Sequence, residues 1–158
     1  MIRTGIGFDI HRLAQGRRLV LGGVEIPHPA GLDGHSDADA VCHALMDALL
    51  GAAAAGDIGQ HFPNTDPRWK DADSLDLLSR TAGIVRGRGY EIANVDAMIM
   101  AEAPRLAPYI SLMRERLAAS RGVQLDHVSV KAGTHEKLDA IGRGEGIGGL
   151  ATAAIYRP

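Results

Sequence analysis

The chain has 158 residues, of which 46% are hydrophobic, 23% are charged and 4% are aromatic, and its formal net charge is −2. This length suits a single domain with its own buried core, and we expect residues 1–158 to form one domain. The near-neutral charge excludes the broad basic surface that nucleic-acid binding requires, although a local phosphate pocket remains compatible with it. The lone cysteine, Cys42, cannot form an intrachain disulfide.

Two further features of the composition limit the function. No stretch approaches the roughly 18 consecutive apolar residues of a membrane span, and residues 1–5 show no secretory signal. We therefore expect a cytoplasmic protein without a membrane partner. Glycine is abundant, at 20 residues of 158, which predicts tight turns and places where backbone segments approach each other closely.

In the first half of the chain we expect a strand, a hairpin and a helix. Residues 3–11 predict a strand that runs into a polar tip, and the Gly22-Gly23 pair predicts the turn of a hairpin over 18–26. An alanine- and leucine-rich segment predicts a helix over 36–55. Ser36 and Asp39 form an approximate capping box at its start.

In the second half, a polar loop over 64–73 precedes a helix, a strand, a second helix and two more strands. These five elements are expected at residues 74–88, 90–102, 108–121, 128–132 and 147–156. The order of elements predicts an α/β (α+β) sandwich. Its core is a mixed four-stranded sheet with helices on one face, and a small hairpin lies beside it.

The first candidate for chemistry joins the first strand to the first helix. Asp9 and His11 lie two apart on a strand and so face the same side. Asp39, His43 and Asp47 are spaced four apart and so share one predicted helix face. One carboxylate with two imidazoles can hold a zinc ion and leave its fourth position open. The alternative is that His43 is only a partly buried core histidine.

Other segments are more ambiguous. The run 142–146 places Arg143 among glycines that can cradle a phosphate, or it is a flexible hairpin. It matches neither a P-loop nor a dinucleotide-binding fingerprint. The run 133–137 can serve a metal and a phosphate, or it is a polar turn. The run 56–59 reads as a helix stop, and Cys42 as a small core residue.

Together these segments resemble the 2-C-methyl-D-erythritol 2,4-cyclodiphosphate synthase family of the non-mevalonate isoprenoid pathway. The resemblance runs nearly from end to end. It rests on Gly7-Phe8-Asp9-Ile10-His11, Gly34-His35-Ser36-Asp37-Ala38-Asp39, His43-Ala44-Leu45-Met46-Asp47-Ala48-Leu49-Leu50-Gly51, Gly56-Asp57-Ile58-Gly59, Phe62-Pro63, Thr65-Asp66-Pro67, Asn94-Val95-Asp96, Ala103-Pro104 and Gly142-Arg143-Gly144-Glu145-Gly146.

The resemblance implies a metal-dependent phosphorus–oxygen lyase. In this reaction the 2-phosphate of 4-diphosphocytidyl-2-C-methyl-D-erythritol 2-phosphate attacks the β-phosphorus, CMP leaves and a cyclic diphosphate forms. It implies zinc on Asp9, His11 and His43, and a second ion, Mg²⁺ or Mn²⁺, on Glu136. By the same resemblance, the catalytic residues that stabilise the transition state are His35 and Thr134.

The resemblance also assigns two pockets and an assembly. The substrate-binding residues are Ser36, Asp57, Ile58, Gly59, Phe62, Pro63, Asn64, Thr65, Asp66, Ala140 and Arg143. The nucleotide-binding residues are Ala101, Glu102, Ala103, Pro104, Arg105, Leu106, Ala107, Gly133, Thr134, His135 and Glu136. The family is a homotrimer with active sites between subunits. Near the trimer axis, by Arg143 and Glu145, lies a cavity that can hold an isoprenoid diphosphate.

Three departures from the family pattern keep other functions open. Asn64 stands where Asp is more usual, Gly133 replaces a Thr, and Asp139-Ala140-Ile141 replaces a typical Gly-Phe-Thr. None of them removes a metal ligand. One alternative is a metal-dependent phosphodiesterase or nucleotide hydrolase. The other is a trimeric isoprenoid-binding module without catalysis.

Overall fold

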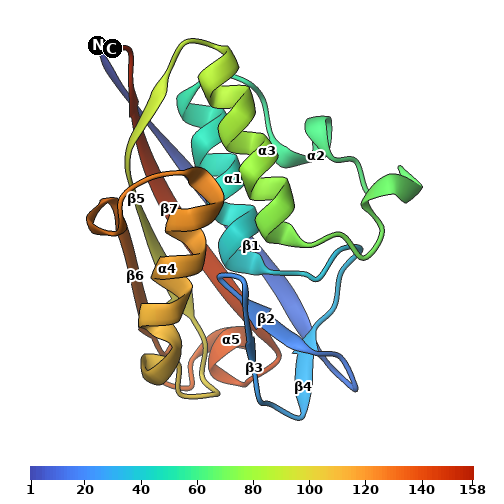
Figure 1. Cartoon of the computed structure of the whole chain (residues 1–158). Helices are drawn as coiled ribbons and strands as arrows, with labels where there is room; N and C mark the ends of the chain where they lie inside the picture. The colour runs from blue at the N-terminus through green and yellow to red at the C-terminus, as the bar shows by residue number, and fades with distance from the viewer.

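The computed structural model describes all residues, 1–158, and its centre is a mixed five-stranded sheet (Figure 1). The strand order is β4 (Ala30–Leu32), β1 (Ile2–Gln15), β7 (Gly146–Tyr156), β5 (Glu91–Met100) and β6 (Val128–Gly133). The predicted four-stranded sheet is therefore wrong by one strand. The extra strand, β4, is too short to show an alternating pattern, and it forms because β1 continues to Gln15 and pairs with it.

Strand directions bring three strand ends to one edge of the sheet. β1 and β5 both run antiparallel to β7, and β6 runs parallel to β5. The C-terminal ends of β1, β5 and β6 therefore lie at the same edge. The predicted hairpin is confirmed as a separate two-stranded sheet of β2 (Leu19–Leu21) and β3 (Val24–Ile26).

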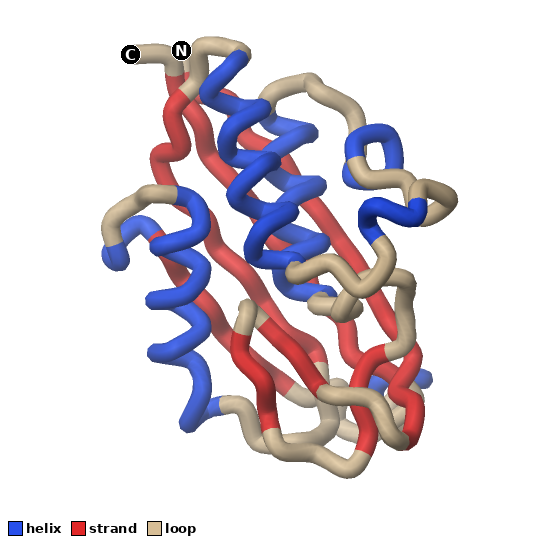
Figure 2. Tube along the Cα trace, turned by 45° about the vertical axis from the view of Figure 1, so that its right-hand side comes forward, coloured by secondary structure: helices blue, strands red, loops and turns tan.

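The three long helices all cover the same face of the sheet, as predicted (Figure 2). They are α1 (Ala40–Ala52), α3 (Ser74–Gly87) and α4 (Ile110–Arg121), and the shorter α2 (Ile58–His61) and α5 (Asp139–Gly142) lie in loops. Single 3₁₀ turns occupy Pro67–Trp69, Ala107–Tyr109 and Leu125–His127. None of the helices is long and apolar enough to cross a membrane.

Helix α1 begins later than predicted. The Asp39 side chain accepts hydrogen bonds from the backbone nitrogens of Val41 and Cys42, so Asp39 is the N-cap and the expected Ser36–Asp39 capping box is wrong. The same carboxylate accepts from the backbone nitrogens of Gly22 and Gly23 at 2.9 and 2.7 Å. One buried carboxylate therefore starts the helix and fixes the hairpin turn.

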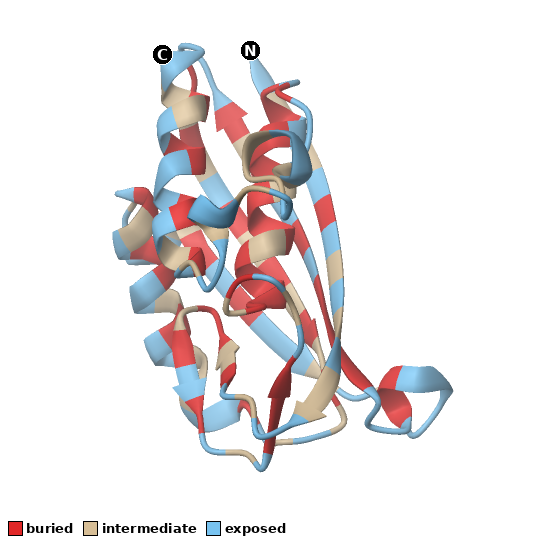
Figure 3. Ribbon diagram, turned by 90° about the vertical axis from the view of Figure 1, so that its right-hand side faces the viewer, coloured by how far each residue is buried: buried red, intermediate tan, exposed pale blue.

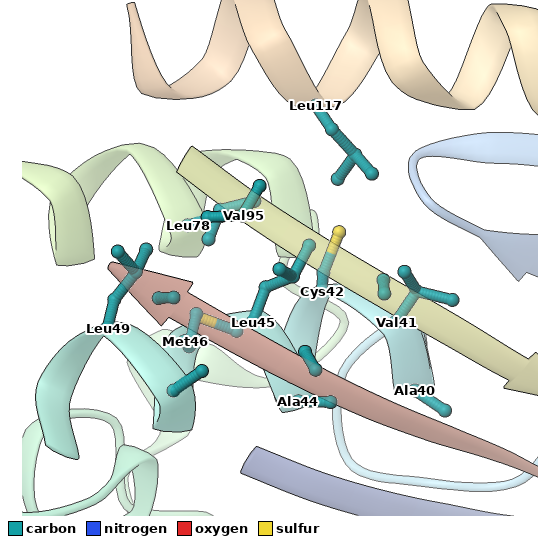
Figure 4. Packing of buried hydrophobic residues seen from close by; sticks show 14 of the residues in the cluster. Ala40, Val41, Cys42, Ala44, Leu45, Met46, Leu49, Leu78, Val95 and Leu117 are labelled. Atoms are coloured by element: carbon teal, nitrogen blue, oxygen red, sulfur yellow. The ribbon is translucent and has the colours of Figure 1, made fainter. Parts of the chain in front are cut away.

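Helix α1 is the centre of the core, and its side chains pack against the other helices and the sheet (Figure 4). The helix packs directly on β1 at Gly7, where the absence of a side chain lets the two backbones approach. A Cβ atom at Gly7 would overlap the carbonyl oxygen of Ala44 and lie 2.7 Å from the backbone nitrogen of Ala48. Cys42 is fully buried, and the prediction that it is a core residue is confirmed.

The opposite face of the sheet carries exposed apolar residues. Figure 3 shows how exposed positions alternate along the strands with less exposed ones. Successive strand residues point to opposite faces, so the residues of β1 between the glycines face away from α1. Ile6, Phe8 and Ile10 are 68%, 54% and 46% exposed, and Leu150 of β7 is 37% exposed. A single chain leaves this face uncovered.

Candidate functional site

The structure brings Asp9, His11 and His43 together at the start of α1. Gly7 faces the body of the helix, and the next residues on that face, Asp9 and His11, reach the side chain of His43. Asp9 Oδ2 lies 2.8 Å from His11 Nε2 and 2.9 Å from His43 Nδ1. The two ring nitrogens are 3.3 Å apart.

The hydrogen bond on the far side of His11 determines which of its ring nitrogens is a free acceptor. His11 Nδ1 lies 2.8 Å from the carbonyl oxygen of Asp33, which can only accept a hydrogen bond. Nδ1 therefore carries the hydrogen, and in the neutral ring Nε2 presents a lone pair to Asp9. Orientation of a ligating imidazole by a carbonyl is a usual feature of metal sites in proteins.

The charges at this cluster are coupled. Burial raises the pKa of the Asp9 carboxyl, but the contacts with His11 and His43 outweigh it and hold this pKa well below the usual range. Burial lowers the pKa of His11, and the hydrogen bond and the charge of Asp9 outweigh it, so the net shift is upward. The half-buried site therefore keeps a negative charge between two imidazoles.

These three residues fit a divalent metal ion. One ligand atom from each can be chosen so that all lie within 4.8 Å of one another. Three electron-pair donors that converge in this way can share one cation. A carboxylate with two imidazoles is a donor set that suits Zn²⁺, and three protein ligands leave a position for substrate.

The two other acidic residues of the predicted helix face stay outside this cluster. Asp39 is the buried N-cap, so the predicted common face with His43 is wrong for Asp39. Asp47 accepts a hydrogen bond from the backbone nitrogen of Ile58 at 2.8 Å and so holds the start of α2. Both carboxylates are occupied by backbone donors.

A cavity of about 470 Å³ opens beside the cluster. Seven predicted substrate-binding residues line it together with His35, namely Ser36, Ile58, Gly59, Phe62, Pro63, Asn64 and Thr65. The sequence reasoning missed Trp69 and Leu77, which also line it. The only tryptophan of the chain, which lies inside the predicted polar loop over 64–73, was the signal for the first. Its ring meets Phe62 edge to face at 5.2 Å between centroids.

The remaining predicted substrate-binding residues lie outside this cavity. Asp57 caps α2 through the backbone nitrogen of Gln60 at 3.0 Å, and Asp66 pairs with Arg68 at 2.6 Å. Ala140 lies in α5, and Arg143 Nε pairs with a carboxylate oxygen of Glu145 at 2.6 Å. The run 142–146 does not form a hairpin: it ends α5 and begins β7.

A second cavity, of about 360 Å³, lies at the ends of β5 and β6. It shares no lining residue with the first cavity. Eight predicted nucleotide-binding residues line it, namely Ala101, Glu102, Pro104, Arg105, Leu106, Ala107, Gly133 and Thr134, and Ala132 and Ile110 were missed. Ala103, His135 and Glu136 do not line it. Glu136 accepts a hydrogen bond from the Thr134 hydroxyl at 3.0 Å, and His135 contacts Asp139 at 2.8 Å.

Fold and site together define a class of α+β proteins in which a carboxylate and two imidazoles, from one strand and the helix packed on it, are placed to hold a metal ion. The chain belongs to the YgbB family, whose model matches residues 2–156. It is similar to the 2-C-methyl-D-erythritol 2,4-cyclodiphosphate synthases of Laribacter hongkongensis and Moorella thermoacetica. The first is 57% identical over 154 residues, which is 98% of this chain and 95% of that protein. The second is 58% identical over 154 residues, which is 98% of this chain and 94% of that protein.

Solved structures of proteins from the same family have the same fold as this chain. The bifunctional IspDF of Campylobacter jejuni is 41% identical with a TM-score of 0.95, over 98% of this chain and 42% of that longer chain. A CDP-bound 2C-methyl-D-erythritol-2,4-cyclodiphosphate synthase is 36% identical with a TM-score of 0.90, over 98% of this chain and all of that one. The resemblance predicted from the sequence is confirmed.

Proposed function

We propose that this chain is a 2-C-methyl-D-erythritol 2,4-cyclodiphosphate synthase. It converts 4-diphosphocytidyl-2-C-methyl-D-erythritol 2-phosphate to the 2,4-cyclodiphosphate and CMP. The observation that carries the proposal is the opening of the Asp9–His11–His43 cluster onto the 470 Å³ cavity, in a chain that matches the family over residues 2–156. Its place would be isoprenoid biosynthesis by the non-mevalonate route, in the cytoplasm.

The reaction needs positioning and charge neutralisation more than proton transfer. A phosphate oxygen of the 2-phosphate forms a bond to the β-phosphorus, the bond from that phosphorus to the bridging oxygen breaks, and its electron pair leaves with CMP. Because the nucleophile is already an anion, no general base is required. A zinc ion held by Asp9, His11 and His43 would supply Lewis-acid neutralisation of the diphosphate charge.

The chain's own residues bind and orient the two ends of the substrate. His35 and Ser36 line the metal-side cavity, where they would contact the phosphates. Asp57 and the backbone of Ile58 and Gly59 would bind the sugar hydroxyls, with residues 62–66 as the outer wall. At the far end, residues 101–107 and 133–136 would bind the cytidine part. Thr134 would stabilise the transition state, and Glu136 would ligate Mg²⁺ or Mn²⁺.

The separation of the two cavities supports an active site shared between subunits. Within one chain, β7 lies between β1, which carries Asp9 and His11, and β5, which leads to the second cavity, where the cytidine part would bind. A homotrimer would place the metal side of one subunit against the nucleotide side of its neighbour. The exposed apolar face of β1 and β7 supports this assembly, because such a patch is seldom left uncovered.

The central cavity follows from the same assembly. Arg143, Glu145 and Ala140 would lie near the trimer axis, where an isoprenoid diphosphate could bind. Arg143 pairs with Glu145 through Nε at 2.6 Å, and its two Nη groups would remain as donors to a diphosphate.

Product analysis tests the proposal. The chain loaded with Zn²⁺ and Mg²⁺ is incubated with the substrate, CMP is quantified by chromatography, and the phosphorus product is identified by ³¹P NMR. We expect CMP and a cyclic diphosphate in equal amounts, and no turnover by His43→Ala. A linear phosphate product would instead identify a hydrolase. Stoichiometric zinc without CMP release would identify a binding module.

A further inference from the structure

The hydroxyl of Ser74 lies between the carboxylate of Asp37 and the imidazole of His43. Ser74 is the first residue of α3 and is fully buried. Its hydroxyl donates to Asp37 Oδ1, and its backbone nitrogen donates to Asp37 Oδ2 at 3.0 Å. On its other side, Ser74 Oγ lies 3.1 Å from His43 Nε2. The three groups form a chain that ends at the metal cluster.

The direction of these hydrogen bonds determines the tautomer of His43. An ionised carboxylate accepts only, and a serine hydroxyl has a single hydrogen. That hydrogen goes to Asp37, so Ser74 Oγ can offer only a lone pair to His43. His43 Nε2 must then carry a hydrogen, and the lone pair of the neutral ring is on Nδ1, which faces Asp9 Oδ2 at 2.9 Å.

We propose that Asp37 and Ser74 are a positioning pair that holds His43 in the tautomer able to ligate a metal ion through Nδ1. This inference rests on the metal site of the proposed function. Neither residue touches the metal or the substrate, and both act through His43. The arrangement matches that of His11, whose Nδ1–H is held by the Asp33 carbonyl so that Nε2 is free. Each imidazole of the site is thus oriented by an acceptor behind it.

A second hydroxyl lies near the same nitrogen but does not select the tautomer. Ser36 Oγ is also 3.1 Å from His43 Nε2, and it accepts from the backbone nitrogen of Ala38 at 3.2 Å. Its own hydrogen has no fixed acceptor, so Ser36 can donate to His43 or accept from it. Only Ser74 has its hydrogen committed elsewhere, because Asp37 accepts from both of its donors.

The test compares Ser74→Ala and Asp37→Asn with a matched control in the full-length chain. The control is Thr81→Val, which removes another buried hydroxyl of α3. That hydroxyl donates only to the Leu77 carbonyl, at 3.0 Å. Zinc affinity is measured by competition with a chelator, and the ring nitrogens of His43 in the zinc-loaded protein are assigned by ¹⁵N NMR. We expect Ser74→Ala to weaken zinc binding about 10- to 100-fold and to expose the Nε2 hydrogen to rapid exchange.

Asp37→Asn should also weaken zinc binding, because its amide nitrogen must face one of the two Ser74 donors. Thr81→Val should bind zinc like the wild type. The inference is overturned if Ser74→Ala binds zinc with wild-type affinity and the ¹⁵N spectrum of its His43 ring is unchanged. Ser74 would then be only a structural link between α1 and α3. If Ser74→Ala does not fold, the wild-type spectrum decides, because zinc on Nε2 of His43 contradicts the proposal. Failure of the wild type to bind zinc would instead refute the metal site itself.

Discussion

Gly7 on β1 lies directly under Ala44 on α1, so close that a Cβ atom at Gly7 would overlap the Ala44 carbonyl oxygen. This contact positions the side chains of the Asp9–His11–His43 cluster. Asp9 follows Gly7 on the same face of the strand, and His43 precedes Ala44 in the first turns of the helix. The closeness of the two backbones therefore determines the distance between the Asp9 carboxylate and the His43 imidazole.

Gly7→Ala should destabilise the protein and loosen the cluster. The added methyl group meets backbone atoms, which cannot rotate away as a side chain could, so we expect a loss of about 3 kcal/mol or more in the free energy of unfolding. Denaturant titration measures this loss. Gly83→Ala is the control, because nothing lies within 4 Å of a Cβ at this exposed position in α3. It should leave stability unchanged or raise it by up to about 1 kcal/mol. Equal stability of the two variants would contradict the prediction.

Arg121→Met should stabilise the protein at neutral pH. The Arg121 side chain is fully buried, and its three guanidinium nitrogens have no hydrogen-bond partner in the protein. An unpaired buried cation is unfavourable, and methionine fills a similar volume without charge, so we expect a gain of about 1 to 3 kcal/mol. Thermal and urea unfolding at pH 7 measure it. A less stable variant would contradict the prediction and show that the Arg121 guanidinium stabilises the folded chain.

The advantage of Arg121→Met should also shrink at high pH. Burial lowers the pKa of Arg121 to about 10. In the unfolded chain the guanidinium keeps its proton to a higher pH, so above about pH 10 the unfolded wild type binds more protons than the folded wild type. Stability of the wild type then rises with pH relative to the variant, which has no such group. Urea unfolding of both proteins between pH 8 and pH 11 checks the sign.

Zinc should raise the melting temperature through His43. A ligand that binds only the folded state at 100 times its Kd adds about 2.7 kcal/mol, which for a chain of this size corresponds to roughly 5–10 °C. His43→Ala removes one of the three ligands, so zinc should no longer shift its melting temperature. His127→Ala, outside the cluster, is the control and should keep the full shift. Calorimetry with and without chelator distinguishes the cases.

Phe8→Asp should break the proposed assembly without unfolding the chain. Phe8 is 54% exposed on the outer face of the sheet, so a carboxylate is tolerated in one chain but would be buried unpaired in a trimer. Sedimentation should show a monomer and activity should fall, because the two cavities would no longer meet. Leu112→Asp changes a side chain on α4 that is 40% exposed, and it should remain a trimer. Trimeric Phe8→Asp would place the interface elsewhere.

Several features follow from local sequence rules. The Gly22-Gly23 turn, the three long helices and the alternation that places Asp9 and His11 on one face are all set by residues near one another in the chain. Their prediction therefore needed no knowledge of the fold. The ordered family motifs identified the function class before any distance was known. They named many of the residues that line the two cavities, but they missed Trp69, Leu77, Ala132 and Ile110.

Tertiary structure decided what depends on distant partners. β4 exists only because β1 extends to meet it, and Asp39 is withdrawn from the predicted metal-side face because the hairpin turn donates two hydrogen bonds to it. Ser74 lies 31 residues from His43, and no local pattern connects them. The sequence alone determined which side chains are available for the chemistry. Only packing of α1 on β1 and α3 decided which of them meet and which nitrogen of His43 faces Asp9, because hydrogen bonds and close contacts act between residues adjacent in space.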